Sequence, residues 1–369
     1  MSEDLRTRQL LWVLRINLLP ELCKSGERKF SEGVILYRIC VFAILAFFFS
    51  AAPAWSWSGK GHRIVGAIAD EVLKKSPTTK AKVKEILGGE TLATVSIWAD
   101  CAKGFTYCHR APSHEEQVYA SKNPEHHNFH YADIPYQESA YVDASAGSAK
   151  YDAVHVISYA VAVLRGNAPA NDSINLTQRE ALWVLAHVVG DIHQPLHVAA
   201  LYYDKDCHDV VDPNIVGAGM PNFGIGTSVS ETTGGNDLTK GSNNLHHYWD
   251  DNFVDKAMKS VGFTANATAK FVTYVVKHPP QNWQTSGDPE TWSAKWASEI
   301  MPTGRFAYEG VRLGQAKHPD EVQPTRLKCT AEVTFEPNYE SDAAKVALRQ
   351  VGKAGFRLAA LLTAVFESQ

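Results

Sequence analysis

The sequence predicts an all-α protein, built as a single compact multi-helix domain with long irregular loops. Apolar residues recur at helical spacing through most of the chain, whereas the alternating pattern of a β-strand is almost absent. We find no internal repeat and no linker of domain scale. The chain has 369 residues, of which 45% are hydrophobic, so it can bury a sizeable core.

The sequence predicts an N-terminal extension over residues 1–56, which ends in a signal peptide, and a functional domain over residues 57–369. The apolar run 39–49 follows basic residues and is too short for a typical membrane-spanning helix. Small residues at Ala54 and Ser56 indicate cleavage after Ser56. A short membrane anchor is the alternative, and a start codon assigned too far upstream would explain the long region before the run. We expect a secreted or periplasmic protein without stable membrane insertion.

Cleavage changes the charge of the protein. It leaves 29 Lys and Arg residues against 35 Asp and Glu residues, a formal charge of −6 in place of −4. An acidic protein is a poor candidate for long-range electrostatic capture of nucleic acid. A phosphate-containing substrate remains possible if a positive metal cluster binds the phosphate locally.

The cleaved chain would begin with Trp57 and reach His62 just before a helix with apolar residues between 64 and 73. A free α-amino group has a pKa of about 8, so it can bind a metal at modest cost. Together with its own carbonyl oxygen it can close a chelate ring. The plainer interpretation, which these residues alone favour, is a buried Trp57 and a surface His62 at a helix start.

The next helix starts at Ser76-Pro77, where we expect a serine cap and a proline in the first helical position. It ends at Gly88-Gly89, and a further segment leads to Asp100, three residues before Lys103. A lone buried aspartate is usually a cap or an ion-pair partner. Residues 125–135 then hold three histidines in a short space.

Only some of these histidines can point inward. His130 and Asp133 flank Tyr131 in a strand-like or irregular segment that a proline stops. Two long helices follow, at 150–165 and 177–193.

The second long helix carries the strongest motif in the chain. His187 and Asp191 are four residues apart, so a helix places both on one face. Pro195 should kink or end the helix, which leaves His197 free to turn toward the same centre. Two imidazoles and a carboxylate suit zinc better than calcium or magnesium. Mutual hydrogen bonding of buried His and Asp is the alternative for this motif alone.

Residues 201–245 are predicted to be mostly irregular and long enough to be functional. A cluster of Asp204, Asp206, Cys207 and His208 could bind metal, but this is the less favoured interpretation of these residues. His246 and Asp250 then repeat the His/Asp spacing on a new helix. These two pairs, the isolated histidines and Asp100 are more His and Asp residues than mutual hydrogen bonding in a buried core would require. Helices at 268–278, 289–301 and 341–367 complete the chain.

Four cysteines remain after cleavage, which is consistent with two disulfides in an oxidising compartment. We expect Cys101 to pair with Cys108 and Cys207 with Cys329, although four cysteines allow three pairings. Sequons at Asn171, Asn175 and Asn266 would carry glycans only if the source glycosylates proteins.

The constellation as a whole resembles the secreted zinc-dependent single-strand nucleases, also called class I nucleases or 3′-nucleotidase/nucleases. The resemblance covers essentially all of 57–369. Its most specific parts are Trp57 with His62, Trp98-Ala-Asp100, His187-xxx-Asp191-xxxxx-His197, Gly235-Asn236 and His246-xxx-Asp250. It implies a helical domain of the phospholipase C and zinc nuclease type.

The resemblance also implies a site with three zinc ions and Asp191 as a bridge between two of them. The implied ligands are Asp100, His130, His187 and Asp191 for one ion, His197, His246 and Asp250 for a second, and Trp57, His62 and Asp191 for the third. Lys103 and Asn236 match the family's phosphate-side residues, and Tyr131 and Asp133 match its base-binding pair. His193 departs from the family pattern, in which an uncharged residue is commoner, so which imidazole near Pro195 is the ligand stays open.

The implied activity is hydrolysis of single-stranded DNA, RNA and 3′-nucleotides to 5′-phosphate products by a monomer. A hydroxide shared by two zinc ions and oriented by Asp100 would attack phosphorus in line. Stacking on Tyr131 requires an unstacked base and so favours single strands. A zinc phospholipase C and a non-catalytic zinc-binding exported protein are the alternatives. Tyr131, Asp133 and Gly235-Asn236 argue against the former; Lys103 and Asn236 would serve no purpose in the latter.

Overall fold

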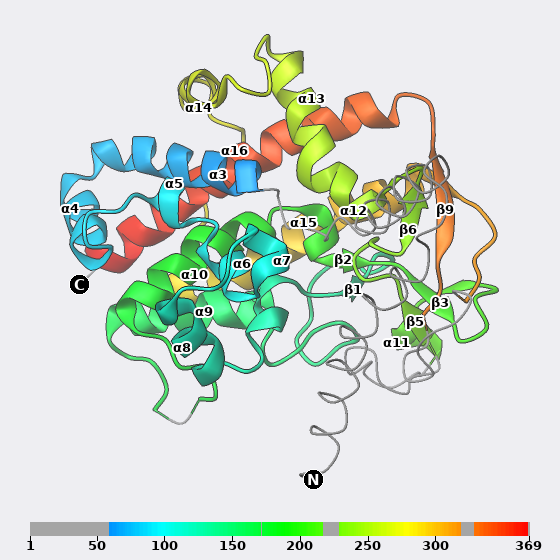
Figure 1. The fold of residues 1–369 in the computed structure, drawn as a ribbon, viewed down its shortest axis with the longest axis horizontal. Coiled ribbons are helices and arrows are strands. Elements are labelled where there is room, and N and C mark those ends of the chain that lie inside the picture. The colour runs from blue at the N-terminus through cyan, green and yellow to red at the C-terminus, as the bar shows by residue number, and fades with distance from the viewer. Residues whose placement is uncertain (1–58, 171, 217–228, 319–327, 368–369) are drawn as a thin grey trace, which may run out of the picture. The chain divides into compact units, whose positions relative to one another are not determined.

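The computed structural model of the protein describes residues 59–170, 172–216, 229–318 and 328–367. The predicted signal peptide, Trp57 and the sequon at Asn171 lie outside these residues. Within them the chain is mainly helical, as predicted, and short strands gather on one side (Figure 1). None of the described helices combines the length and the apolar character that crossing a membrane requires.

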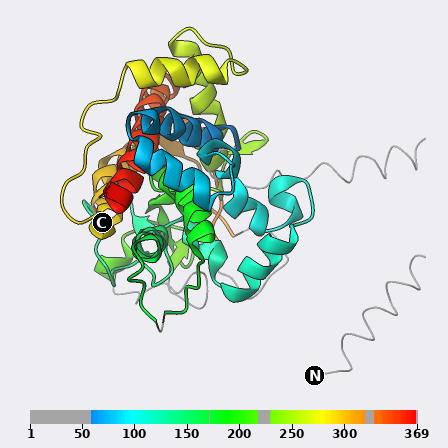
Figure 2. The ribbon, with the colours of Figure 1, turned by 90° about the vertical axis from the view of Figure 1, so that its left-hand side faces the viewer.

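The central scaffold consists of three helices that pack on one another, namely α3 (Gly59–Val72), α10 (Gln178–Asp191) and α16 (Tyr339–Glu367) (Figures 1 and 2). A fourth helix, α9 (Ala153–Arg165), packs against α10. The close approach of α3 and α16 depends on Gly355, because a Cβ there would lie 2.5 Å from the Cβ of Ile68. Helix α10 is buried over almost its whole length, as its continuous apolar run predicts.

Both ends of α10 follow from local chemistry. Thr177 and Glu180 form a capping box, in which each side chain accepts a hydrogen bond from the other residue's backbone N–H. The helix ends at Asp191 because Pro195, four residues later, has no N–H to donate to the Asp191 carbonyl. The proline ring would also clash with that carbonyl. The N–H of Gln194 bonds the Asp191 carbonyl instead, at 2.8 Å. The predicted helix end before Pro195 is therefore confirmed, and the 3₁₀ turn η4 (Pro195–His197) follows.

Helix α4 (Pro77–Ile86) has Pro77 in its first position, as predicted. The predicted serine cap is wrong, because the Ser76 side chain makes no capping hydrogen bond. Ser76 instead closes the preceding 3₁₀ turn η2 (Leu73–Lys75) through its backbone N–H. The predicted later helices are present as α14 (Thr268–Lys277), η6 (Pro289–Thr291), α15 (Trp292–Glu309) and α16. The shorter segments are α5 (Leu92–Val95), α6 (Trp98–Ala102), α7 (Phe105–Cys108), α8 (His114–Lys122), η3 (His126–His130), α11 (Pro213–Val216), α12 (Leu245–His247), the π-helix η5 (Tyr248–Asn252) and α13 (Phe253–Ser260).

In the part of the chain that the structure describes, short strands form three small sheets. One is a parallel pair, another has the order β4-β3-β5 and the third the order β7-β6-β9-β8. Several lie in the stretch 201–245 that we expected to be mostly irregular. They escape detection because two or three residues are too few to show alternation. The strands are β1 (Ile134–Pro135), β2 (Ala199–Ala200), β3 (Tyr202–Asp204), β4 (Val210–Val211), β5 (Val229–Glu231), β6 (Leu238–Lys240), β7 (Asn243–Asn244), β8 (Val311–Leu313) and β9 (Ala331–Phe335).

The parallel β1–β2 pair is short, but it positions two segments that carry candidate ligands. It aligns Ile134 with Ala199, and the N–H of Ala132 donates to the His197 carbonyl at 2.8 Å. The segment that carries His130 is thereby fixed beside the segment that carries His197, although the two histidines are far apart in sequence.

Both expected disulfides are present, Cys101–Cys108 and Cys207–Cys329. The possible metal cluster around Cys207 is instead a turn, because its sulfur is bonded to Cys329. The Asp204 carboxylate there accepts hydrogen bonds from the backbone N–H groups of Asp206 and His208.

Candidate metal centre

The predicted metal ligands within the described residues are brought together and buried around the end of α10. They form three groups, and within each group the ligand atoms lie within 4.8 Å of one another. The groups are Asp100, His130 and His187; His197, His246 and Asp250; and His62, His187 and Asp191. Trp57, the remaining predicted ligand, lies outside the described residues.

The first group lies between α6, η3 and α10. Asp100 Oδ1 is 3.6 Å from His187 Nε2 and 3.8 Å from His130 Nδ1. Asp191 faces the same two rings, because its Oδ2 is 3.1 Å from His130 Nδ1 and 3.2 Å from His187 Nε2. Both carboxylates therefore approach the same two imidazoles, and carboxylate and imidazole are ligand types that zinc takes.

Asp191 also faces a second group through its other oxygen. Its Oδ1 lies 3.3 Å from His62 Nε2, and the His62 ring stacks on the His187 ring with centroids 3.8 Å apart. One carboxylate thus presents one oxygen to each of two groups, which is the geometry that a bridging ligand needs. His62 is buried at the core of the site, so the alternative of a surface residue at a helix start is wrong.

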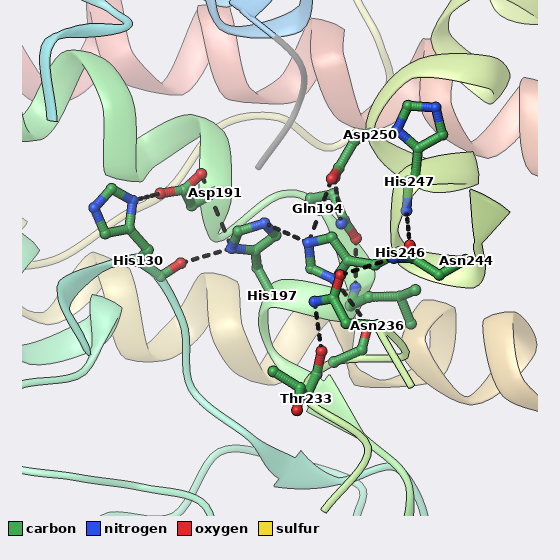
Figure 3. A network of polar contacts seen from close by, with 12 residues as sticks. His130, Asp191, Gln194, His197, Thr233, Asn236, Asn244, His246, His247 and Asp250 are labelled. Carbon is green, nitrogen blue, oxygen red and sulfur yellow. Dashed lines mark hydrogen bonds and ion pairs between the residues drawn. The ribbon is translucent and has the colours of Figure 1, made fainter. Parts of the chain in front are cut away.

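The remaining group joins η4 to the helical segments α12 and η5 (Figure 3). His197 Nε2 and His246 Nε2 are 3.1 Å apart, and His246 Nε2 is 3.4 Å from Asp250 Oδ2. The predicted one-turn spacing of His246 and Asp250 holds even though Asp250 lies in a π-helix. Such distortions of a helix are frequent at functional sites.

Gln194 is a residue of this group that the sequence did not single out. Its Oε1 accepts the backbone N–H of Leu196, so its Nε2 must face Asp250 Oδ1, at 2.7 Å. Asp250 is left with Oδ2, which is buried and has no hydrogen-bond partner among the described residues. An oxygen in this state fits a metal ligand.

The protonation of the histidines supports the same conclusion. His187, His197 and His246 each place Nδ1 within 2.6 to 2.8 Å of a backbone carbonyl, which can only accept, so Nδ1 carries the proton. Their Nε2 lone pairs then point inward, and those of His197 and His246 face each other. In metal-bound histidines, one ring nitrogen donates a hydrogen bond of this kind, which fixes the tautomer and the orientation of the ring so that the other nitrogen can bind the metal. A bound cation would relieve the repulsion of the two facing lone pairs, so the residues present fit a metal.

Burial keeps the imidazoles of His62, His130 and His246 neutral, whereas at His187 burial is outweighed by the carboxylates of Asp191 and Asp100, which raise the pKa. Burial lowers the pKa of His130 and His246 to about 3 and that of His62 to about 4. Neutral rings keep a lone pair for a metal at ordinary pH. Burial by itself would raise the pKa of Asp100, but Lys103 and the surrounding imidazoles outweigh it and hold the pKa below its usual range.

The predicted phosphate-side residues border the metal groups. Lys103 Nζ is 2.8 Å from Asp100 Oδ1 and lies over the Tyr107 ring. Asn236 stands on a tight turn that requires Gly234, since that glycine has φ of 56° and a Cβ there would lie 2.4 Å from the Leu196 carbonyl oxygen. The turn therefore sits directly on the segment before His197.

A pocket of about 330 Å³ opens onto the centre. It combines imidazoles of the metal groups with both predicted phosphate-side residues and both predicted base-binding residues. Tyr107, His127, Asn128, Glu231 and Thr233 also line it and were not predicted; aromatic and polar residues of this kind give no signal without the fold. The lining is completed by Lys103, His130, Tyr131, Asp133, Leu196, His197, Gly234, Asn236 and His246.

His193 points away from the metal groups. Its Nδ1 donates to the Val189 carbonyl at 2.8 Å, and its Nε2 accepts from Arg357 at 3.0 Å. Both ring nitrogens are used by the scaffold, so His197 is the imidazole beyond the helix end that faces the other ligands.

Comparison with known proteins gives a consistent result. Residues 57–367 match the family described as S1/P1 Nuclease. Endonuclease 2 of Arabidopsis thaliana is 26% identical over 345 residues, which cover 89% of this chain and 97% of the relative. Nuclease S1 of Aspergillus oryzae is 26% identical over 334 residues, covering 85% and 92% respectively. Endonuclease 4 of A. thaliana is 22% identical over 329 residues, covering 86% and 91%.

Proposed function

This chain belongs to the S1/P1 nuclease family, and from that premise we propose that it is an exported, zinc-dependent endonuclease and 3′-nucleotidase. Membership makes the chain a nuclease, a hydrolase of phosphodiester bonds. The finer proposal is that it cleaves single-stranded DNA and RNA to 5′-phosphate products. The observation that carries it is the single pocket in which candidate metal ligands, phosphate-side donors and an aromatic side chain meet.

We assign the metal ligands as three zinc sites, with Asp191 shared by two of them. Zinc bound there would make hydroxide available near neutral pH and would draw electron density from the phosphoryl oxygens. The proposed sites are Asp100, His130, His187 and Asp191; His197, His246 and Asp250; and His62 and Asp191 with Trp57, which lies outside the described residues.

Two side chains of the pocket would act on the phosphate directly. Lys103 and the Asn236 amide are N–H donors, so they would bind the equatorial phosphoryl oxygens, which gain charge in the transition state. Asp100 would accept a hydrogen bond from the attacking water and thereby orient it. Its ion pair with Lys103 keeps this carboxylate charged.

The base would stack on Tyr131 and bond to Asp133. The Tyr131 hydroxyl donates to Asn128 Oδ1 at 2.9 Å, which holds the ring in the pocket wall. A base inside a duplex cannot reach such a ring, so this contact accounts for a preference for single strands without a sequence code. The proposed substrates therefore need only a phosphoryl group and one exposed base.

Parallel assays on the purified protein test this function. Zinc content is measured with hydrolysis of single-stranded DNA, duplex DNA, RNA, a 3′-mononucleotide and phosphatidylcholine. We expect about three zinc ions per chain, rapid cleavage of the single strands and 3′-nucleotide, and slow cleavage of the duplex. Cleavage of phosphatidylcholine alone would favour a phospholipase C, and zinc binding without hydrolysis would favour a storage or structural role.

Tyr131→Ala is expected to weaken nucleotide binding, because loss of base stacking costs about 1–3 kcal/mol per base. Steady-state rates on a dinucleotide and on a small phosphodiester without a base check this; the second rate should change little. Tyr131→Phe is the matched control, since it keeps the ring and loses only the bond to Asn128. If the alanine variant loses both activities equally, Tyr131 supports the neighbouring His130 and does not bind a base.

A further inference from the structure

The side-chain amide of Asn236 is held by a relay of hydrogen bonds that begins and ends on backbone groups (Figure 3). The backbone N–H of His247 donates to Asn244 Oδ1 at 2.7 Å. Asn244 Nδ2 donates to Asn236 Oδ1 at 3.3 Å, and Asn236 Nδ2 donates to the Thr233 carbonyl at 2.7 Å. Asn244 thus links the start of α12 to the pocket.

This relay runs in one direction only. A backbone N–H can only donate and a carbonyl can only accept, so the two ends fix which atom of each amide faces its neighbour. If either amide were turned over, one of its two contacts would pair two donors and the other would pair two acceptors. An amide nitrogen carries two N–H groups, and the Thr233 carbonyl uses one of those on Asn236.

The orientation matters because Asn236 lines the same pocket as Lys103. With its oxygen bonded to Asn244 and one N–H bonded to Thr233, the amide has its second N–H left for whatever fills the pocket. An N–H donor matches an anionic phosphoryl oxygen, whereas an amide oxygen would repel it. The turned-over amide would therefore be inhibitory.

We propose that Asn244 is a positioning residue, which fixes the Asn236 carboxamide with an N–H directed at the substrate phosphate. The proposal rests on the proposed function, in which Asn236 binds that phosphate. Asn244 also caps α12, which carries His246. The test must therefore separate the relay from the cap.

Asn244→Asp makes this separation. A carboxylate still accepts the His247 N–H and caps the helix, but it has no N–H for Asn236 Oδ1. Asn236 would then have an oxygen facing an oxygen whichever way its amide is turned, so the relay would no longer fix the orientation of that amide. Asn243→Asp is the matched control: it introduces the same charge one residue earlier, outside the relay.

We expect Asn244→Asp to lower kcat/KM on single-stranded DNA by about 100-fold, the usual effect of losing one such donor. Affinity for inorganic phosphate, measured by calorimetry on the zinc-loaded protein, should fall by at least about 10-fold. Zinc content and thermal midpoint should match those of Asn243→Asp, which should retain wild-type kcat/KM and phosphate affinity. Unchanged phosphate affinity and activity in Asn244→Asp would overturn the proposal.

A double-mutant cycle supplies the decisive comparison, because residues that act through one another are not additive. In an Asn236→Ala background, Asn244→Asp should cause no further loss of phosphate affinity or rate. An undiminished second loss would show that Asn244 acts through the cap and would overturn the relay. If the wild-type protein cleaves no phosphodiester, the proposed function fails by itself, and the phosphate-affinity cycle still decides the role of Asn244.

Discussion

Asp191→Asn is expected to lower nuclease activity by about 10³-fold or more and to remove more than one zinc ion per chain. The two oxygens of Asp191 face different histidine groups, at 3.1 and 3.2 Å on one side and 3.3 Å on the other. Asparagine keeps the shape but replaces one oxygen by an NH₂ group, which cannot bind a metal in place of that oxygen. Metal-based stabilisation of a phosphoryl transition state amounts to several kcal/mol, which corresponds to this loss of rate.

Zinc per chain and kcat/KM should be measured on the same preparation. Asp251→Asn is the matched control, because it makes the same change beside the metal groups, at a carboxylate that lies 3.8 Å from Lys60. It should keep its zinc and its rate. Full zinc with near-normal activity in Asp191→Asn would show that Asp191 does not bridge two metals.

Residues left attached in front of Trp57 are expected to remove about one zinc ion and most of the activity. Only a free terminus offers an amine lone pair, because inside a chain the same nitrogen is an amide and a very poor zinc ligand. His62 is already in place beside Asp191, and α3 begins only three residues before it. If the proposed cleavage after Ser56 occurs, it would create two ligand atoms on one residue, so that export and activation become one event.

The comparison is between protein that starts at Trp57 and protein that keeps Trp55 and Ser56. Mass spectrometry confirms each terminus, circular dichroism should show equal helix content, and zinc analysis and rates should differ. In a His62→Asn background, which lacks another ligand of that site, the two forms should no longer differ. Equal zinc and equal rates in the wild-type background would make Trp57 a buried end and remove the third metal site.

The sequence by itself determines the parts of the centre that lie within one helical turn. His187 with Asp191 and His246 with Asp250 follow from the period of a helix, and Pro195 sets where α10 ends. Family resemblance adds which isolated residues join these pairs. The structure brings together all of them that lie within the described residues, which do not include Trp57.

Other features depended on tertiary structure. The β1–β2 pair places His130 beside His197, and strands of two residues carry no periodic signal. Arg357, from α16, donates a hydrogen bond to His193 and so ties this histidine to the scaffold.

Gln194 and Asn244 acquire their roles through hydrogen bonds to Asp250 and Asn236. A helix repeats every few residues, so a short window of sequence specifies which side chains share a face. Contacts between segments tens of residues apart are set by the packing of the whole core, which no local window contains.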